Sequence, residues 1–136
     1  MRLYAAVAGH PNDELTRRVF EAFNGGDARA LVEGIAEDAV WRVVGAAPVS
    51  RVYRGRDEIF ELFRLTRRLT DGTYRSRLRW SVADDDHAVA VYRATGTRDG
   101  RTLDIDQALL VTLRDGRWSE IVALPTDPLA FEAFWA

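Results

Sequence analysis

Apolar residues recur at helical spacing in three segments of the first half of the chain. Residues 12–27 carry one apolar stripe, with Asn12 or Asp13 placed to cap the start of a helix and two glycines to end it. The stripe consists of Leu15, Val19, Phe20 and Phe23. Residues 28–36 predict a short second helix, and residues 56–72 predict a third. Helices therefore dominate the chain up to about residue 72.

The second half of the chain alternates with a period of two instead. In residues 73–82 the side chains Tyr74, Ser76, Leu78 and Trp80 alternate with arginines, which indicates a strand with one inward face. Residues 88–124 predict a meander of three long strands, with turns at two Arg-Asp-Gly sequences. A further strand is expected over residues 39–45, before the third helix.

Helices followed by an antiparallel meander predict the α+β class. We expect a cone-shaped barrel, in which a curved antiparallel sheet wraps around the N-terminal helices. With 136 residues, the chain has room for one domain, 1–136. Residues 1–12 are expected to form an N-terminal arm, and residues 126–136, which are rich in aromatic side chains, an apolar cover.

The Asp-Gly turn at residues 99–100 fixes which side chains share a face of the sheet. If Asp99 and Gly100 form a two-residue turn, paired residues have numbers that sum to 199. Tyr92 then lies opposite Gln107 on the inner face, and Arg93 lies opposite Asp106 on the outer face as an ion pair. The outer face also carries apolar residues that require a cover, and we expect a homodimer to form there. These residues are Val89, Val91, Ala108 and Leu110.

Composition and charge exclude several classes of function. The formal net charge is −2, so we expect no nucleic-acid partner, and no apolar run approaches the length of a membrane span. The chain has no cysteine, no secretory signal is recognised, and a cytoplasmic location is expected. All 19 basic residues are arginines, which excludes lysine chemistry and is typical of a GC-rich bacterial genome. No cluster has the spacing of metal ligands, so we expect neither a metal nor another cofactor.

The phrases EAFNGGD, AEDAVW and YRGRDEI, in this order, are similar to those of SnoaL-like domains. That family belongs to the nuclear transport factor 2 and ketosteroid isomerase superfamily, and the resemblance covers about residues 13–128. It implies a cone-shaped fold, commonly a homodimer, with a pocket between sheet and helices. The superfamily includes cyclases, isomerases, epoxide hydrolases and non-catalytic binders, so the reaction has to be argued from the site.

The resemblance also indicates where catalytic groups of relatives would fall. The base of ketosteroid isomerases falls on Val43 and their protonated acid on Leu109. The Arg-x-Asp part of limonene epoxide hydrolases falls on Gln107 to Leu109, with the second Asp near Ala123. The His-x-Asp pair of SnoaL-type cyclases falls on Ile121 and Ala123. The usual acid–base groups are therefore absent at these positions.

The orientation of the last strand stays open at this point. A two-residue Asp-Gly turn directs Trp118, Val122 and Leu124 inward, whereas a three-residue bulge turn directs Ile121 and Ala123 inward. With the bulge turn, the predicted ligand-binding residues combine aromatic walls with few polar groups. They are Trp41, Val43, Tyr53, Phe63, Tyr74, Trp80, Tyr92, Gln107, Leu109, Ile121, Ala123 and Trp135. Phe20 and Phe23 are interpreted as simple core.

Three hypotheses about function follow. In the first, the pocket binds an apolar, ring-containing or polyketide-like molecule, with any cyclase or isomerase activity arising from substrate orientation alone. In the second, the protein is a non-catalytic dimeric module with a filled core. A cavity below about 150 Å³ favours this hypothesis, against ~300–1,000 Å³ for ligand sites. In the third, the chain is a cyclase, isomerase or epoxide hydrolase with relocated acid–base residues, such as Glu120 or Asp57.

Overall fold

The computed structural model describes residues 9–136, in which helices alternate with the strands of one six-stranded sheet. The helices are α2 (Pro11–Gly25), α3 (Ala28–Gly34), α4 (Gly55–Leu69) and α5 (Pro128–Trp135). The strands are β1 (Ile35–Val43), β2 (Val52–Arg54), β3 (Arg75–Ala83), β4 (His87–Arg98), β5 (Arg101–Arg114) and β6 (Arg117–Pro125). The α+β class predicted from the sequence is confirmed.

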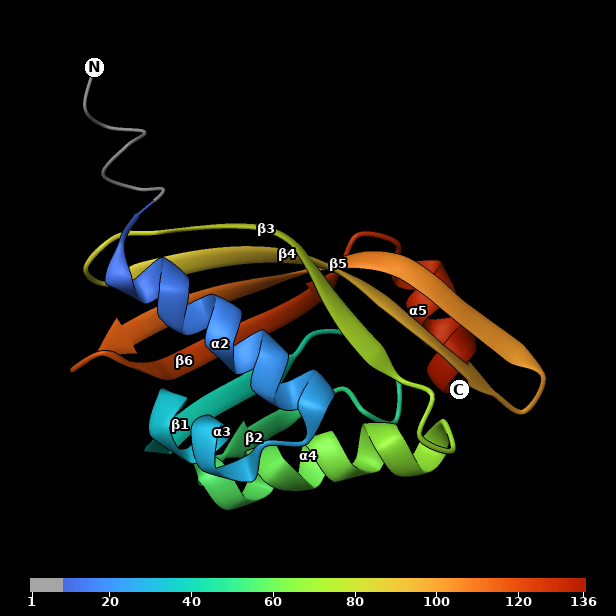
Figure 1. The fold of residues 1–136 in the computed structure, drawn as a ribbon. Coiled ribbons are helices and arrows are strands. Elements are labelled where there is room, and N and C mark those ends of the chain that lie inside the picture. The colour runs from blue at the N-terminus through green and yellow to red at the C-terminus, as the bar shows by residue number, and fades with distance from the viewer. Residues whose placement is uncertain (1–8) are drawn as a thin grey trace.

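The sheet has the strand order β2-β1-β6-β5-β4-β3 and curves around the helices. Figure 1 shows α2 and α4 on one side of the long strands. The last helix, α5, lies beside β5, near the C-terminus of the chain (Figure 1). The pairs β1–β2, β6–β5, β5–β4 and β4–β3 are antiparallel, as expected for a meander. The pair β1–β6 is parallel, which makes the sheet mixed and brings β1 beside the last strand.

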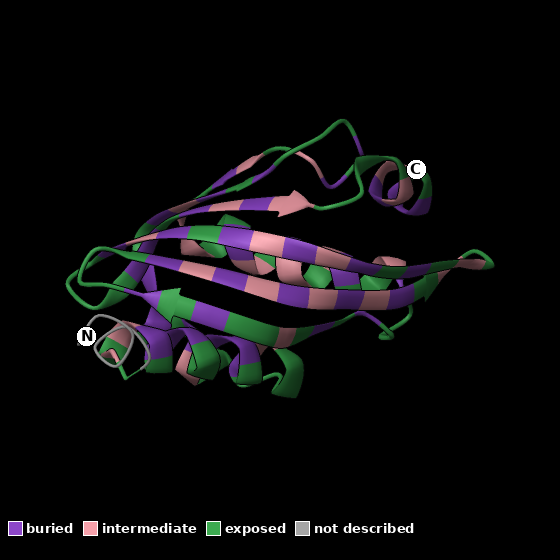
Figure 2. Ribbon diagram, turned by 90° about the horizontal axis from the view of Figure 1, so that it is seen from above, coloured by how far each residue is buried: buried purple, intermediate pink, exposed green. Residues whose placement is uncertain are grey.

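The hairpin between β4 and β5 has the register that the Asp-Gly turn predicts. Arg98 pairs with Arg101, and Asp99 and Gly100 have φ angles of 50° and 77°. Positive φ at both central residues is the requirement of a type I′ turn. Tyr92 therefore pairs with Gln107, and buried residues alternate with more exposed ones along both strands (Figure 2).

The ion pair predicted from this register is present on the outer face. Arg93 Nη1 lies 3.3 Å from Asp106 Oδ1, and Arg93 Nε lies 2.7 Å from Asp104 Oδ1. Arg93 holds the pKa of the Asp104 carboxyl below its usual value, mainly through their hydrogen bond. The two carboxylates of β5 thus belong to the outer face and are remote from the core.

A β-bulge in β3 overturns one prediction from the alternation. Leu78 pairs with Tyr92, but the next pair is Trp80 with Val91, so Arg79 is an extra residue. One extra residue reverses the face of every side chain after it. Trp80 is therefore on the outer face and 52% exposed, and Ser81 is buried in its place. The assignment of Trp80 to the inner face was wrong for this reason.

The turn before β6 combines the two alternatives that the sequence left open. Arg114 pairs with Arg117 across a two-residue turn, which directs Trp118 inward. A bulge at Ser119 then shifts the register by one residue, which directs Ile121 and Ala123 inward as well. Trp118 and Ala123 can share the inner face only because Ser119 is inserted between them.

The first described helix begins differently from the prediction. His10, and not Asn12 or Asp13, is the N-cap of α2, and its Nδ1 accepts a hydrogen bond from Asn12 N at 3.0 Å. His10 Nε2 lies 2.8 Å from Asp85 Oδ1, which ties the cap to the β3–β4 turn. Because Pro11 is already helical, only residues before it can form an arm. Residues 1–8 of the predicted arm lie outside the described residues.

The segment predicted as an apolar cover forms α5, whose aromatic side chains Phe131, Phe134 and Trp135 are buried. Two arginines of the β4–β5 hairpin hold its C-terminal end. Arg98 Nη1 donates to Ala136 O at 2.6 Å, and Arg101 Nη1 donates to Ala133 O at 2.8 Å. Cations at the carbonyl end of a helix interact favourably with its dipole. The β4–β5 hairpin therefore holds the C-terminal end of α5 in place.

Candidate functional site

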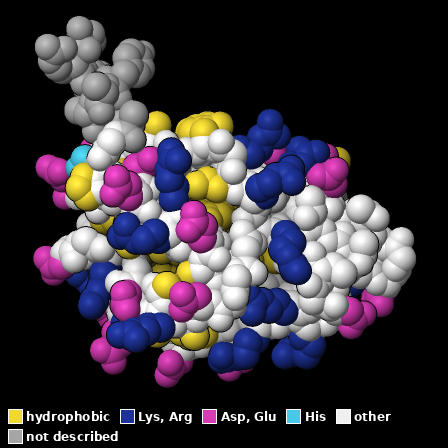
Figure 3. All heavy atoms as spheres, viewed as in Figure 1, with side chains coloured by type: hydrophobic (Ala, Val, Ile, Leu, Met, Phe, Trp, Pro, Cys, Tyr) yellow, Lys and Arg dark blue, Asp and Glu magenta, His cyan; other side chains and the backbone are white. Residues whose placement is uncertain are grey.

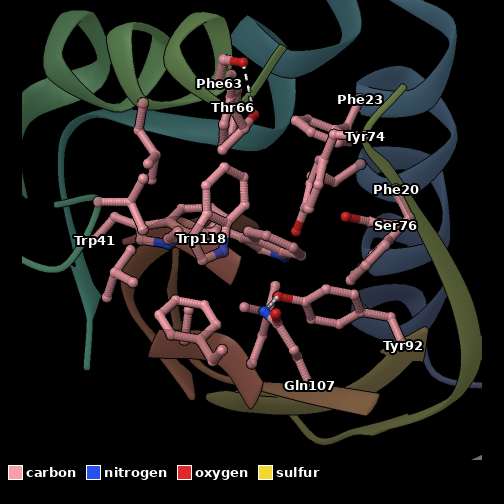
Figure 4. A pocket seen from close by; sticks show the side chains of 18 residues that line it. Phe20, Phe23, Trp41, Phe63, Thr66, Tyr74, Ser76, Tyr92, Gln107 and Trp118 are labelled. Atoms are coloured by element: carbon pink, nitrogen blue, oxygen red, sulfur yellow. Dashed lines mark hydrogen bonds between the residues drawn. The ribbon is translucent and has the colours of Figure 1, made fainter. Parts of the chain in front are cut away.

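An apolar cavity lies between the inner face of the sheet and the helices α2, α4 and α5 (Figure 4). Every strand except β2 contributes to its wall, and most of the wall is aromatic or aliphatic. The lining residues are Val19, Phe20, Phe23, Trp41, Val43, Val49, Leu62, Phe63, Thr66, Tyr74, Ser76, Tyr92, Gln107, Leu109, Trp118, Ala123, Phe131 and Trp135. The fold thus brings together side chains from both ends of the sequence around one hollow.

The free volume inside the cavity is small. The hollow measures about 660 Å³ when counted out to its mouth, but only about 80 Å³ of it admits the centre of a water molecule. The larger value includes open solvent, so the volume of about 80 Å³ is the one to compare with ligand sites, which measure ~300–1,000 Å³. It lies below that range and below the limit of about 150 Å³ given above, so this conformation favours the hypothesis of a filled core. The smaller volume decides what enters without side-chain movement, because a molecule needs width as well as length. The space that is free between the lining side chains in this conformation is therefore small.

Among residues 9–136, those that line the cavity include no acid, histidine, lysine or arginine, and their titratable groups are two tyrosines. Burial raises the pKa of Tyr92 well above its ordinary value, and the nearby Tyr74 raises it further. Burial also raises the pKa of Tyr74. Both phenols are therefore neutral at physiological pH and serve as hydrogen-bonding groups, because their conjugate bases are disfavoured.

The polar groups of the cavity centre on Gln107. Its Nε2 donates a hydrogen bond of 2.8 Å to Tyr92 Oη, which confirms the predicted contact (Figure 4). Within residues 9–136, three buried polar side-chain atoms have no hydrogen-bond partner, and all belong to lining residues: Gln107 Oε1, Trp118 Nε1 and Trp135 Nε1. Each buried group left without a partner costs about 1–3 kcal/mol. Three of the lining side chains thus each hold a buried polar atom without a partner, two of them N–H donors and one an acceptor.

The cavity wall includes most of the residues predicted to bind a ligand. Those that line it are Trp41, Val43, Phe63, Tyr74, Tyr92, Gln107, Leu109, Ala123 and Trp135. Trp41 packs edge-on against Phe63, with ring centroids 5.4 Å apart, so β1 and α4 share one aromatic wall. Their role in binding stays a prediction, but their position around one space is now described.

Tyr53, Trp80 and Ile121 do not line the cavity. Tyr53 is buried, but its hydroxyl donates a hydrogen bond to Val49 O at 2.7 Å. This hydroxyl therefore already has a partner in the loop before β2. Trp80 lies outside because of the bulge in β3. Ile121 is 1% exposed and faces inward, but it belongs to the core and not to the cavity lining.

Several lining residues were missed or interpreted as core. Phe20 and Phe23 border the cavity as well as packing in the core, and Phe20 lies 5.2 Å from the Tyr92 ring. Ser76 was visible as an inward residue in the alternation of β3, and that signal was sufficient to find it. The orientation of Trp118 depended on the type of turn before β6, and the sequence left that type open. Thr66 lies on the inner side of α4, where its hydroxyl bonds to Phe63 O.

Most of the positions where the resemblance places catalytic groups of relatives line the cavity, and Ile121 is the exception. Val43, Leu109 and Ala123 all line it, and none of them can exchange a proton. The proposed substitutes Glu120 and Asp57 are both exposed and neither lines the cavity, so they are not placed to act on a molecule bound there. Within residues 9–136, no group of three or more His, Asp or Glu side chains is arranged to hold a metal ion.

The fold and this cavity define an α+β protein of the nuclear transport factor 2-like class. The sequence is more specific: a model of the SnoaL-like domain matches residues 16–121. The chain is 36% identical over 124 residues to the uncharacterized protein Rv0034 of Mycobacterium tuberculosis, which covers 90% of this chain and 95% of that protein. The chain belongs to the SnoaL-like family.

Two solved structures are similar over nearly their whole length. Bal32a, from a soil-derived mobile gene cassette, is 30% identical, with a TM-score of 0.89 over 93% of this chain and 97% of that one. A loop-truncation variant of IdmH is 25% identical, with a TM-score of 0.74 over 93% of this chain and 100% of that one. In the described part of the chain, no helix has the length and apolar character required to cross a membrane.

Proposed function

We propose that this protein binds a flat, mostly apolar, ring-containing small molecule that carries oxygen atoms, of the kind found among polyketides. The observation that carries the proposal is the set of three unpartnered polar atoms in the cavity wall. A fold that serves only as a scaffold gains nothing from burying Trp118 Nε1, Trp135 Nε1 and Gln107 Oε1 without partners. A ligand that pairs with them recovers part of this cost.

The chemistry of these atoms defines the polar part of the ligand. The two indole N–H groups only donate, so they require acceptor oxygens such as carbonyl or ether groups. Gln107 Oε1 only accepts, so it requires a hydroxyl. A ring that carries both a carbonyl or phenolic oxygen and a hydroxyl satisfies this arrangement. The remaining aromatic and aliphatic wall supports a ligand that is otherwise apolar.

The small free volume of the cavity means that its walls separate when a ligand enters. A planar ligand requires the least separation. The free volume of about 80 Å³ is roughly half that of an engineered cavity of about 150 Å³ that binds benzene. Phe23 and Phe63 are only partly buried and lie 5.0 Å apart between α2 and α4. Movement of these two rings widens the cavity, and their contacts with Trp41 and Tyr74 adjust with it.

A cyclase that acts by substrate orientation is the second candidate. IdmH, which this chain resembles in structure, is a candidate polyketide cyclase of Streptomyces antibioticus. The wall of this cavity holds no side chain suited to proton abstraction. A reaction here therefore depends on folding the substrate into a reactive conformation, which is worth several orders of magnitude in rate when the geometry is correct.

Binding is tested with a matched pair of ligands, 1-naphthol and naphthalene, by titration calorimetry and by the shift in Tm. We expect 1-naphthol to bind about tenfold more tightly than naphthalene, because it alone bonds to the unpartnered atoms. In Trp118→Phe, which lacks the indole N–H, this preference should fall about fivefold. Trp80→Phe is the control, because Trp80 lies on the outer face and its loss should leave binding unchanged.

The opposite result has a clear interpretation. If neither ligand raises Tm and no small molecule copurifies with the protein, the narrow cavity is a filled core and the chain is a structural module. If naphthalene binds as tightly as 1-naphthol, the unpartnered atoms do not select the ligand. Mass spectrometry of solvent extracts of the purified protein identifies any natural ligand directly.

A further inference from the structure

A second hollow lies on the outside of the cavity wall, between the C-terminal end of α2 and the turn before β3. It measures about 250 Å³ and is lined by Phe23, Asn24, Gly25, Gly26, Arg67, Gly72, Tyr74 and Arg75. We refer to it as the arginine groove. Phe23 and Tyr74 also line the inner cavity, and their ring centroids lie 6.0 Å apart. The groove and the cavity are therefore two sides of one thin aromatic wall.

The groove lies in the most basic part of the chain. Residues 64–79 contain six arginines and a single acid, Asp71, although the whole chain has a formal net charge of −2. On the face drawn in Figure 3, several basic side chains lie over the right half and the lower edge, with acidic side chains interspersed among them. This local excess of positive charge attracts an anion and repels a cation.

The two arginines of the groove are not neutralised by the protein. Arg64 pairs with Glu61 and Arg79 pairs with Asp106, but within residues 9–136 no carboxylate lies within salt-bridge distance of Arg67 or Arg75. An arginine in this state retains its full charge for a ligand. The groove residues themselves include no acid.

Backbone carbonyls hold both guanidinium groups in place and leave other N–H groups free. Arg67 Nη2 donates to Phe23 O, and Arg75 Nη1 donates to Gly72 O at 2.9 Å and to Tyr74 O at 2.8 Å. A guanidinium has five N–H donors in a planar fork that matches a carboxylate. Gly72 adds space, because a Cβ there would contact nothing within 4 Å. The groove is thus open and carries oriented donors.

We propose that the arginine groove binds a carboxylate at the end of a short chain on the ligand, while the ring of the same ligand occupies the inner cavity. The tail of the ligand passes between Phe23 and Tyr74, whose rings pack edge to face in this conformation and have to separate to admit it. This inference rests on the proposed function, since it names the class of ligand for the same site: an oxygenated ring with an acidic tail. Neither the family nor the inner cavity by itself specifies such a tail.

The test compares 4-(4-hydroxyphenyl)butanoate with its uncharged primary amide, by titration calorimetry at pH 7 and low salt. We expect the acid to bind about fivefold more tightly than the amide, since the arginines are exposed but oriented. The preference should disappear in Arg67→Gln and in Arg75→Gln, and it should weaken as salt is added. The amide should bind the two variants and the wild type equally.

Arg68→Gln and Arg77→Gln are matched controls, because both arginines are exposed and belong to the same segment but do not line the groove. They should keep the preference for the acid. If they lose it as fully as Arg67→Gln does, a diffuse field acts and the groove is not a site. Circular dichroism and Tm establish that each variant is folded, and Arg75→Gln provides a second test if Arg67→Gln is unfolded.

The failure of this inference differs from the failure of the proposed function. If 1-naphthol binds but the acid and the amide bind equally, the groove does not recognise carboxylates and the ring site stands. If neither 1-naphthol nor either phenol binds, the proposed function fails and this inference fails with it. Tight binding of the acid that survives both groove substitutions also overturns the inference.

Discussion

Gln107 and Tyr92 lie directly opposite each other on β5 and β4, and Gln107 Nε2 donates to Tyr92 Oη at 2.8 Å inside the cavity. The pair satisfies one end of the amide and leaves the other end, Oε1, without a partner. Turning the amide by 180° exchanges the two ends, because the tyrosine hydroxyl can then donate to the oxygen. In both orientations one buried amide atom of this lining residue stays unpaired: Oε1, an acceptor, in the structure, and Nε2, a donor, after the turn.

Removal of the tyrosine hydroxyl should destabilise the protein more than removal of the whole pair. In Tyr92→Phe, both amide atoms of Gln107 are buried without partners, and the free energy of unfolding should fall by about 1–3 kcal/mol. In the double variant Tyr92→Phe with Gln107→Leu, no unpaired atom of the pair remains. We therefore expect the double variant to be more stable than Tyr92→Phe alone. Urea denaturation followed by circular dichroism measures both values.

The single variant Gln107→Leu completes this set and tests the role of Gln107 in binding. Gln107→Leu alone should lose the discrimination between hydroxylated and plain ring ligands while the protein remains folded. If Tyr92→Phe costs nothing, the hydrogen bond contributes nothing to stability, and the argument from the buried pair is lost. A large loss in the double variant would instead indicate that shape, and not polarity, governs this position.

Much of the fold followed from short-range signals in the sequence. The Asp-Gly turn at Asp99 and Gly100 fixes the register of β4 against β5, and that register placed Gln107 and Tyr92 inside and Arg93 with Asp106 outside. Helical spacing located α2, α3 and α4, because their apolar stripes are regular. Turn chemistry and periodicity act over a few residues, and a single sequence displays them directly.

The remaining features depend on events that leave no local signal. The bulges at Arg79 and Ser119 each insert one residue, which moves Trp80 out of the inner face and lets Trp118 share it with Ala123. Nothing in the composition of these strands marks the inserted residue. The unpartnered indole nitrogens were equally unpredictable, because their state depends on what neighbouring elements offer.

Stability should fall at alkaline pH because of the buried phenols. Burial raises the pKa of Tyr74 and Tyr92 above the value of about 10 that an unfolded chain has. A raised folded-state pKa means that folding favours the protonated phenol, so this contribution is fully present below pH 10. It is lost as the pH rises through the folded-state values. The midpoint of urea unfolding should therefore be level up to about pH 9 and decline above pH 10.

The chain is well suited to this measurement, because it contains no lysine and no cysteine that would titrate in the same range. Tyr92→Phe should reduce the alkaline loss relative to wild type, and Tyr74→Phe should reduce it by a separate amount. An alkaline decline that persists unchanged in both variants would show that neither phenol causes it. The comparison uses the slope against pH, so the lower stability of the variants at pH 7 does not affect it.

The outer face of the sheet presents a continuous apolar surface. Trp80 pairs with Val91, Val91 with Ala108, and Leu110 with both Val89 and Val122, so the surface crosses four neighbouring strands. Trp80 is 52% exposed and Leu110 is 46% exposed. The bulge that removed Trp80 from the cavity therefore added it to this surface. Exposed apolar surface of this kind is typical of an interface between subunits.

We expect the chain to form a homodimer through this face, and Leu110→Arg should convert it to a monomer, because an arginine there places an unpaired charge at the centre of the contact. Light scattering after size-exclusion chromatography measures the mass at several concentrations. Leu129→Arg is the matched control, since Leu129 is 83% exposed on α5, away from the sheet face. A wild-type mass of one chain at all concentrations, or equal masses for both variants and the wild type, would contradict the prediction.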